Sequence, residues 1–448
     1  MHHVIEQLKK IIRLGVFLLG LIPLLLFGNT FFTQTDSVAA MTMHEIREQS
    51  DAELAIVGSS MALYHMNPEI IGEAAGMKTV TAAITGLMPP GAKALTRELF
   101  RHASPEQIVL VLESGSFDTV KEDPMTQMKL APHLSSPIDR MTYWLETAAC
   151  DGDYAGRLLL MNTFGHQDAK DFAKTIRFRA DHDGAARAAE REWAGEYAFH
   201  RGQLRIERAD PVTEDTQDWF IRVETGNYYE LMDQTRAWLR EYRDLCEDNG
   251  AKLTVVIAPE MTVTMLREPE RLTYLDSAQA FFAEEGIPCY NMLYAKESLL
   301  PDLNGYYYDY HHMLAEGADI LSAAVGRVIA AHNAGEDISA HFCRNRYAYL
   351  AEIDFMTNVW ATARRRDGRI ALTADSNRGA NVEAEYSFAL LAPDGSETEL
   401  RGYAPEAEFS LDPALVLPGS RVRVRGRAKG SSDAFRYDLT LDGEGQAL

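Results

Sequence analysis

Up to about residue 335, the chain alternates between short, uninterrupted apolar runs and longer stretches with a helical repeat. Short apolar runs rich in β-branched residues are typical of strands buried on both faces, as in a parallel sheet. Apolar residues spaced three or four apart, as in 228–249 and 315–332, predict helices. The runs that predict strands are residues 54–57, 78–84, 108–112 and 253–257. We therefore predict an α/β layer fold over residues 51–335.

Residues 119–226 interrupt this alternation, because they carry many charges and contain no run that predicts a strand. We predict a helical insertion there. It would leave the carboxyl end of a strand, which is where a lid would cover a ligand site in an α/β sheet. A purely structural helical subdomain is the alternative.

The C-terminal region, residues 353–448, changes to a period of two. Val382, Ala384, Tyr386, Phe388 and Leu390 alternate with mostly polar residues, and turn residues follow at Pro393-Asp394-Gly395. Such strands, separated by turns, are typical of a small antiparallel β-sandwich.

The N-terminus has an uncharged stretch over residues 14–32, preceded by Lys9, Lys10 and Arg13. Its length predicts a transmembrane anchor over residues 1–33, followed by a helical stalk over 34–50. The basic flank predicts a cytoplasmic N-terminus, with the main domains outside a cell membrane. A cleaved signal peptide and a buried core helix are the alternatives.

Composition narrows the function classes. The 448 residues are too many for one ordinary core. A formal net charge of −22 opposes nonspecific binding to nucleic acid. The four cysteines show no C-x-x-C spacing, so we expect no zinc site, and their disulfide state stays open. We expect no cofactor.

Two peptides carry the candidate chemistry. Gly58-Ser59-Ser60 follows the first predicted strand, and Asp309 and His312 lie three residues apart before the last helix. A serine on such a turn is either a helix N-cap or a nucleophile. Asp309 and His312 favour the nucleophile, because a histidine can take the proton of Ser60 while an aspartate fixes its tautomer.

Two other interpretations of these peptides are weaker. A metal site at Asp309, His311 and His312 lacks a fourth ligand. A lipase of the α/β-hydrolase class would have glycine at the place of Ala62, and its acid would usually come well before its histidine.

At these residues the chain resembles the SGNH (GDSL-type) hydrolases. Gly58-Ser59-Ser60 resembles their first block, and the Asp309-to-His312 run that enters a helix resembles their last. The resemblance implies Ser60 as the nucleophile, His312 as the base and Asp309 as the orienting acid. It also implies Gly86, after the second strand, as an oxyanion N–H donor.

The third block departs from the family pattern. SGNH enzymes usually carry Gly-x-Asn-Asp after the third strand, whereas this chain has Glu113-Ser114-Gly115-Ser116. Ser114 and Ser116 are the nearby substitutes for the missing oxyanion asparagine. Loss of one such donor typically lowers the rate by about 10²- to 10³-fold.

This version is similar to a membrane-anchored subgroup that includes the D-alanine transfer protein of teichoic-acid D-alanylation and polysaccharide O-acetylation proteins. The resemblance implies an extracytoplasmic acyl hydrolase or O-acyltransferase that forms an acyl-serine. Its implied partners are a membrane-bound O-acyltransferase and a cell-envelope polysaccharide or teichoic-acid-like polymer. The alternative is a non-catalytic glycan-binding or scaffold protein of the same fold.

Overall fold

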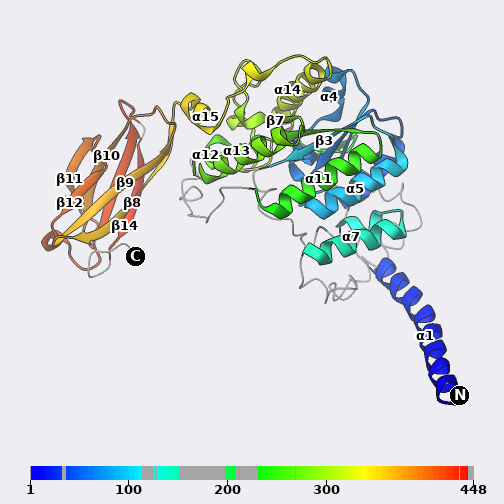
Figure 1. Ribbon diagram of the computed structural model, residues 1–448. Coiled ribbons are helices and arrows are strands. Elements are labelled where there is room, and N and C mark those ends of the chain that lie inside the picture. Colours follow the sequence, from blue (N-terminus) through cyan, green and yellow to red (C-terminus); the bar gives the residue numbers. More distant parts are fainter. Residues whose placement is uncertain are drawn as a thin grey trace.

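The computed structural model describes residues 2–32, 37–113, 126, 129–150, 197–207, 211, 231–267, 269–432 and 434–441. Its larger unit is built on a five-stranded sheet in which all neighbours pair in parallel, in the order β2-β1-β3-β6-β7 (Figure 1). The strands are β1 (Leu54–Gly58), β2 (Thr79–Ala83), β3 (Gln107–Leu112), β6 (Lys252–Ile257) and β7 (Cys289–Asn291). The predicted α/β architecture with a parallel sheet is confirmed; only β7 was not predicted.

Side chains along the strands alternate between two hydrophobic clusters, because successive residues of a strand point to opposite faces of a sheet. On β1, Ala55 and Val57 belong to one cluster, whereas Leu54 and Ile56 belong to the other. Both faces of the sheet are therefore buried, as the uninterrupted apolar runs predict.

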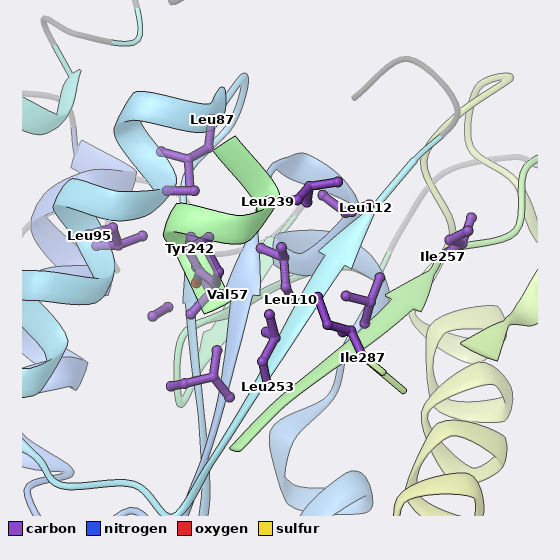
Figure 2. Packing of buried hydrophobic residues seen from close by; sticks show 14 of the residues in the cluster. Val57, Leu87, Leu95, Leu110, Leu112, Leu239, Tyr242, Leu253, Ile257 and Ile287 are labelled. Carbon is purple, nitrogen blue, oxygen red and sulfur yellow. The ribbon is translucent and has the colours of Figure 1, made fainter. Parts of the chain in front are cut away.

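Helices α5 (Pro89–His102), α11 (Asp233–Asp248) and α13 (Pro269–Glu284) contribute to the first cluster. Figure 2 shows Val57 and Leu110 from the sheet with Leu95 of α5 and Tyr242 of α11. Tyr242 is fully buried, and its hydroxyl lies 2.7 Å from Thr96 Oγ1 on α5. The hydrogen bond satisfies both hydroxyls inside an apolar layer.

Helices α3 (Ser60–His65), α4 (Pro68–Ala75) and α14 (Ala315–Asn333) contribute to the second cluster. Asn67 joins them: its Oδ1 caps α4 by accepting from the backbone N–H of Glu69, and its Nδ2 donates to Asp319 on α14 at 2.8 Å. Helices α11 and α14 confirm the two helices that the periodicity predicted.

Helix α2 (Ser37–Glu48) corrects the predicted stalk. Met41, Met43 and Ile46 are fully buried in the two clusters, and Thr42 Oγ1 donates to the carbonyl of Ala83 at 3.0 Å. The helical spacing of these apolar residues lets α2 pack them against the α/β unit, so the segment belongs to the core of that unit.

Helix α1 (His2–Phe32) precedes this unit and extends away from it (Figure 1). Among the described residues, no helix has both the length and the apolar character needed to cross a membrane. The predicted anchor over residues 1–33 is therefore not supported.

The predicted insertion, residues 119–226, lies largely outside the described residues. Its described part holds α7 (Pro137–Cys150) and an unpredicted hairpin of β4 (Tyr197–His200) and β5 (Gln203–Ile206). The hairpin turn touches the central sheet, because Thr81 N donates to Arg201 O at 3.1 Å. Gly202 has φ +90°, and a Cβ there would lie 1.8 Å from Thr81 O, so only glycine fits this contact.

The C-terminal region forms two antiparallel sheets, ordered β11-β10-β13-β14 and β12-β9-β8, that share one hydrophobic cluster including Phe388, Val424 and Leu372. Helix α15 (Arg346–Glu352) leads into it, and Ala380 N donates back to Leu350 O at 2.8 Å. The strands are β8 (Met356–Arg366), β9 (Arg369–Arg378), β10 (Ala384–Leu391), β11 (Glu397–Ala404), β12 (Glu408–Leu411), β13 (Arg421–Ala428) and β14 (Phe435–Thr440).

The remaining described elements are short. They are α12 (Thr262–Arg267) and the 3-10 turns η2 (Ala131–His133), η5 (Met292–Tyr294), η6 (Asn304–Tyr306), η7 (Ser339–His341) and η8 (Pro413–Leu415).

Candidate active site

The candidate residues gather at one edge of the parallel sheet. Strands β1, β3 and β6 run in the same direction, and Gly58 is in register with Val111 while Leu112 is in register with Ile257. The segments that follow these three strands therefore meet at the carboxyl edge, where open α/β sheets bind ligands.

The sequence left two roles open for a serine on this turn, helix N-cap and nucleophile, and Ser59 takes the N-cap role. Ser59 is the N-cap of α3, and its Oγ accepts from Met61 N at 3.4 Å. Its hydroxyl also lies 3.5 Å from Glu113 Oε1. Ser60 is the first residue of the helix and is only partly buried. The Ser60 hydroxyl has no hydrogen-bond partner within the described residues, so it is not used as a cap.

Asp309 and His312 form a compact pair on the loop before α14. Asp309 Oδ2 lies 2.8 Å from His312 Nδ1, and Oδ1 accepts from the backbone N–H groups of His311 and His312 at 2.8 and 2.7 Å. Burial raises the pKa of Asp309, but the hydrogen bonds from His312 and from both backbone groups outweigh it and lower the pKa to about 2. The carboxylate is ionised at neutral pH and accepts a hydrogen bond from Nδ1–H of His312, which leaves the other ring nitrogen able to accept a proton.

His312 lies against the helix that carries Ser60. Its ring packs edge-on against Tyr64, with ring centroids 4.9 Å apart. Tyr64 and Ser60 are four residues apart on α3 and so share a face of that helix. No hydrogen bond joins Ser60 to His312 in the described part of the chain.

A second group of polar residues at this edge was missed by the sequence analysis. Glu260 follows β6, and its Oε2 lies 3.3 Å from Arg271 Nη1 and 3.4 Å from His311 Nδ1. Burial and the charge of Glu260 raise the pKa of Glu113. Burial lowers the pKa of His311, but Glu260 and Glu113 together raise it above its usual value. Glu113 comes directly after β3, and Glu260 follows Ala258 and Pro259 at the end of β6. That position after an apolar strand was the signal available in the sequence.

These groups do not make a recognisable metal centre. No set of three or more His, Cys, Asp or Glu side chains within the described residues has the arrangement of a metal site. Of the cysteines, Cys246, Cys289 and Cys343 are free thiols, and burial raises the pKa of each.

The structure describes one of the three residues implied for the oxyanion site. Gly86 lies in a turn just after β2 with φ +71°, and its carbonyl accepts from Thr126 Oγ1 at 2.9 Å. Ser114 and Ser116 lie outside the described residues.

Gly58 is where a small change should disturb the site most directly. A Cβ at this position would lie 2.8 Å from both Ala62 Cβ and Val111 O, which belong to α3 and β3. We expect Gly58→Ala to lower the free energy of unfolding by about 1–3 kcal/mol, because helix and strand must move apart. Urea unfolding measures the loss. Gly305→Ala is the control, since nothing lies within 4 Å of a Cβ there; equal stability of the two variants would contradict the prediction.

Comparisons with known proteins add no relationship. No family model and no curated protein matched the chain. A solved crystal structure of an engineered protein aligns over 91% of this chain and 98% of its own, at 9% identity and a TM-score of 0.15. A score this low carries no argument about fold, so the resemblance to SGNH hydrolases rests on the residues themselves.

Proposed function

We propose that the protein is a serine-dependent acyl hydrolase or O-acyltransferase in which Ser60 forms an acyl-serine. The observation that carries the proposal is the hydrogen bond of 2.8 Å between Asp309 and His312. It lies at the same edge of the sheet as Ser60, whose hydroxyl does not cap helix α3. The separation of roles between Ser59 and Ser60 supports the nucleophile over the cap.

In the proposed mechanism His312 moves one proton in each half of the reaction. Ser60 Oγ attacks the acyl carbonyl and passes its proton to the free ring nitrogen of His312. That proton then goes to the leaving alkoxide as its bond to the acyl carbon breaks. Water or a sugar hydroxyl next gives a proton to His312 and attacks the acyl carbon; the bond from that carbon to Ser60 Oγ then breaks, and His312 returns the proton to Oγ. Asp309 holds the ring and stabilises its charged form.

The oxyanion and substrate assignments follow the family resemblance. We propose the backbone N–H of Gly86 as one oxyanion donor, with Ser114 or Ser116 in place of the missing asparagine. The proposed acceptor is a cell-envelope polysaccharide or teichoic-acid-like polymer, and a membrane-bound O-acyltransferase is the proposed partner. The extracytoplasmic location stays a prediction.

One observation favours a second candidate function. Ser60 and His312 make no hydrogen bond within the described residues, as expected if the site binds a glycan or a partner acyltransferase without catalysis. A fluorophosphonate probe separates the two functions, because it reacts with an activated serine and loses fluoride.

If the enzyme proposal is correct, the wild-type protein gains one phosphonate adduct, which peptide mass spectrometry places on Ser60. Ser60→Ala should abolish the adduct. Ser59→Ala is the matched control: it removes the helix cap, worth about 1 kcal/mol, and should keep the adduct. A folded wild-type protein that stays unlabelled, or labelling of Ser60→Ala at the wild-type rate, would instead favour the non-catalytic function.

A further inference from the structure

His65 is a fully buried histidine at the last position of α3. The helix has six residues, so the candidate nucleophile Ser60 and His65 occupy its two ends. A short rigid element therefore joins the turn after β1 to whatever His65 contacts.

That contact is the loop of the candidate base. His65 Nε2 accepts from the backbone N–H of Met313 at 3.1 Å, and Met313 directly follows His312. The loop is closed on itself, because Tyr308 N donates to His312 O at 2.7 Å and Met313 forms a bridge with Tyr307. Holding Met313 therefore holds the whole loop.

Both sides of the contact are anchored elsewhere. On the loop side, the Tyr307 hydroxyl donates to Pro259 O at 3.0 Å, just after β6. On the helix side, Ser322 Oγ donates to His65 O at 3.1 Å, and Gln203 Nε2 donates to Tyr64 O at 3.2 Å. Helix α3 is thus held in place by α14 and β5. The hydrogen bond from Met313 to His65 therefore opposes movement of the loop relative to Ser60.

The protonation state of His65 fits this contact. To accept from Met313, Nε2 must be unprotonated, so the neutral ring carries its proton on Nδ1. Nδ1 is buried and has no hydrogen-bond partner within the described residues. Burial, reinforced by His312, lowers the pKa of His65 to about 3, which keeps the ring neutral. An apolar side chain would fill this place without an unpaired buried donor, so the imidazole is costly for packing alone.

We propose that His65 is a positioning residue, which sets the distance and angle between His312 and Ser60 by holding the backbone of Met313. It touches neither substrate nor reacting atoms. The inference rests on the proposed function of Ser60 and His312.

The test compares His65→Leu, which removes the acceptor, with His65→Gln, whose amide oxygen can still accept from Met313. The rate of fluorophosphonate labelling at Ser60 should fall about 10²-fold in His65→Leu and recover in His65→Gln, because small misplacements of catalytic groups have effects of that size. Tyr242→Phe is the stability control: it removes a buried hydrogen bond in the other cluster and should label at the wild-type rate. Labelling of His65→Leu within about twofold of wild type, or a loss in Tyr242→Phe of the same size, overturns the proposal.

A second measurement does not depend on catalysis. Hydrogen exchange of the peptide containing Met313 should be faster in His65→Leu than in wild type and in His65→Gln. Unchanged exchange would overturn the inference even if the enzyme proposal stands. If wild-type protein is not labelled at Ser60, the proposed function fails, and the positioning role fails with it; faster exchange would then show only a structural contact.

Discussion

Replacing Asp309 by asparagine should slow reaction at Ser60 by about 10⁴-fold while leaving the fold intact. The substitution keeps the shape of the side chain and changes one hydrogen-bonding group. It is therefore a sharper test of the proposed mechanism than removal of the side chain would be.

The expected loss follows from the three hydrogen bonds of Asp309. An asparagine can keep Oδ1 on the backbone N–H groups of His311 and His312, which preserves the loop. Its NH₂ group then replaces Oδ2, at 2.8 Å from His312 Nδ1. Because NH₂ donates, Nδ1 must accept, and the ring proton moves to the other nitrogen. That tautomer cannot take the proton of Ser60.

The alternative rotamer of the asparagine does not restore all three hydrogen bonds. If the amide turns so that its oxygen accepts from His312 Nδ1, the NH₂ group faces two backbone donors, and the loop loses both caps. Fluorophosphonate labelling rates measure the effect. Asp139→Asn is the matched control, because Asp139 of α7 is a buried carboxylate that pairs with Arg101 of α5 at 2.6 Å. Asp309→Asn protein that reacts within threefold of Asp139→Asn protein would argue strongly against the triad.

The fold was predictable where the local pattern of apolar residues matches their burial in the folded protein. Strands β1, β2, β3 and β6 consist mostly of consecutive apolar residues because both faces of the sheet are covered. Strand β7 was missed because it has three residues, Cys289–Asn291, which is too short for a periodic signal. The β4–β5 hairpin was missed because its turn, at Arg201 and Gly202, is specified by contact with Thr81 far away in the sequence.

The helix-like α2 segment shows a related limit. Its residues predict a helix, but nothing in the sequence shows that Met43 packs into the first hydrophobic cluster and Met41 into the second. Secondary structure is encoded locally, whereas the partner of an apolar face is set by the rest of the fold.

The candidate site also has a part that the sequence predicted and a part that it did not. Asp309 and His312 could be paired from sequence because three residues separate them and one loop holds both. The neighbourhood of Glu113, Glu260 and His311 could not, because it forms only when β3, β6 and the last loop meet. His65 gave no signal at all: a histidine on the apolar side of a short helix is indistinguishable from a packed core residue until its bond to Met313 is seen.

His65 should also make the protein sensitive to mild acid. Its pKa is about 3 in the folded protein, because of burial first and of the neighbouring His312 second, against 6.5 for an unhindered histidine. Asp309 and a backbone hydrogen bond from His311 oppose this downward shift of the pKa, whereas the charge of His311 adds to it. Above pH 6.5 the ring is neutral in both states and adds no pH dependence. As the pH falls below 6.5, His65 binds a proton in the unfolded chain but not in the folded protein. Stability is therefore lost progressively until the pH reaches the pKa of His65 in the folded protein.

At pH 5 this linkage should lower the free energy of unfolding by about 2 kcal/mol relative to pH 7.5, since each pKa unit corresponds to about 1.4 kcal/mol. His65→Gln removes the titrating group and keeps an acceptor for Met313, so its loss of stability between the two pH values should be smaller than that of wild type by that amount. Urea unfolding at pH 7.5 and pH 5 measures both. Tyr242→Phe should lower stability equally at the two pH values, because burial raises the pKa of Tyr242 far above this range. If His65→Gln instead loses as much stability as wild type between pH 7.5 and pH 5, His65 is not held neutral, and its bond to Met313 cannot be the contact that positions His312.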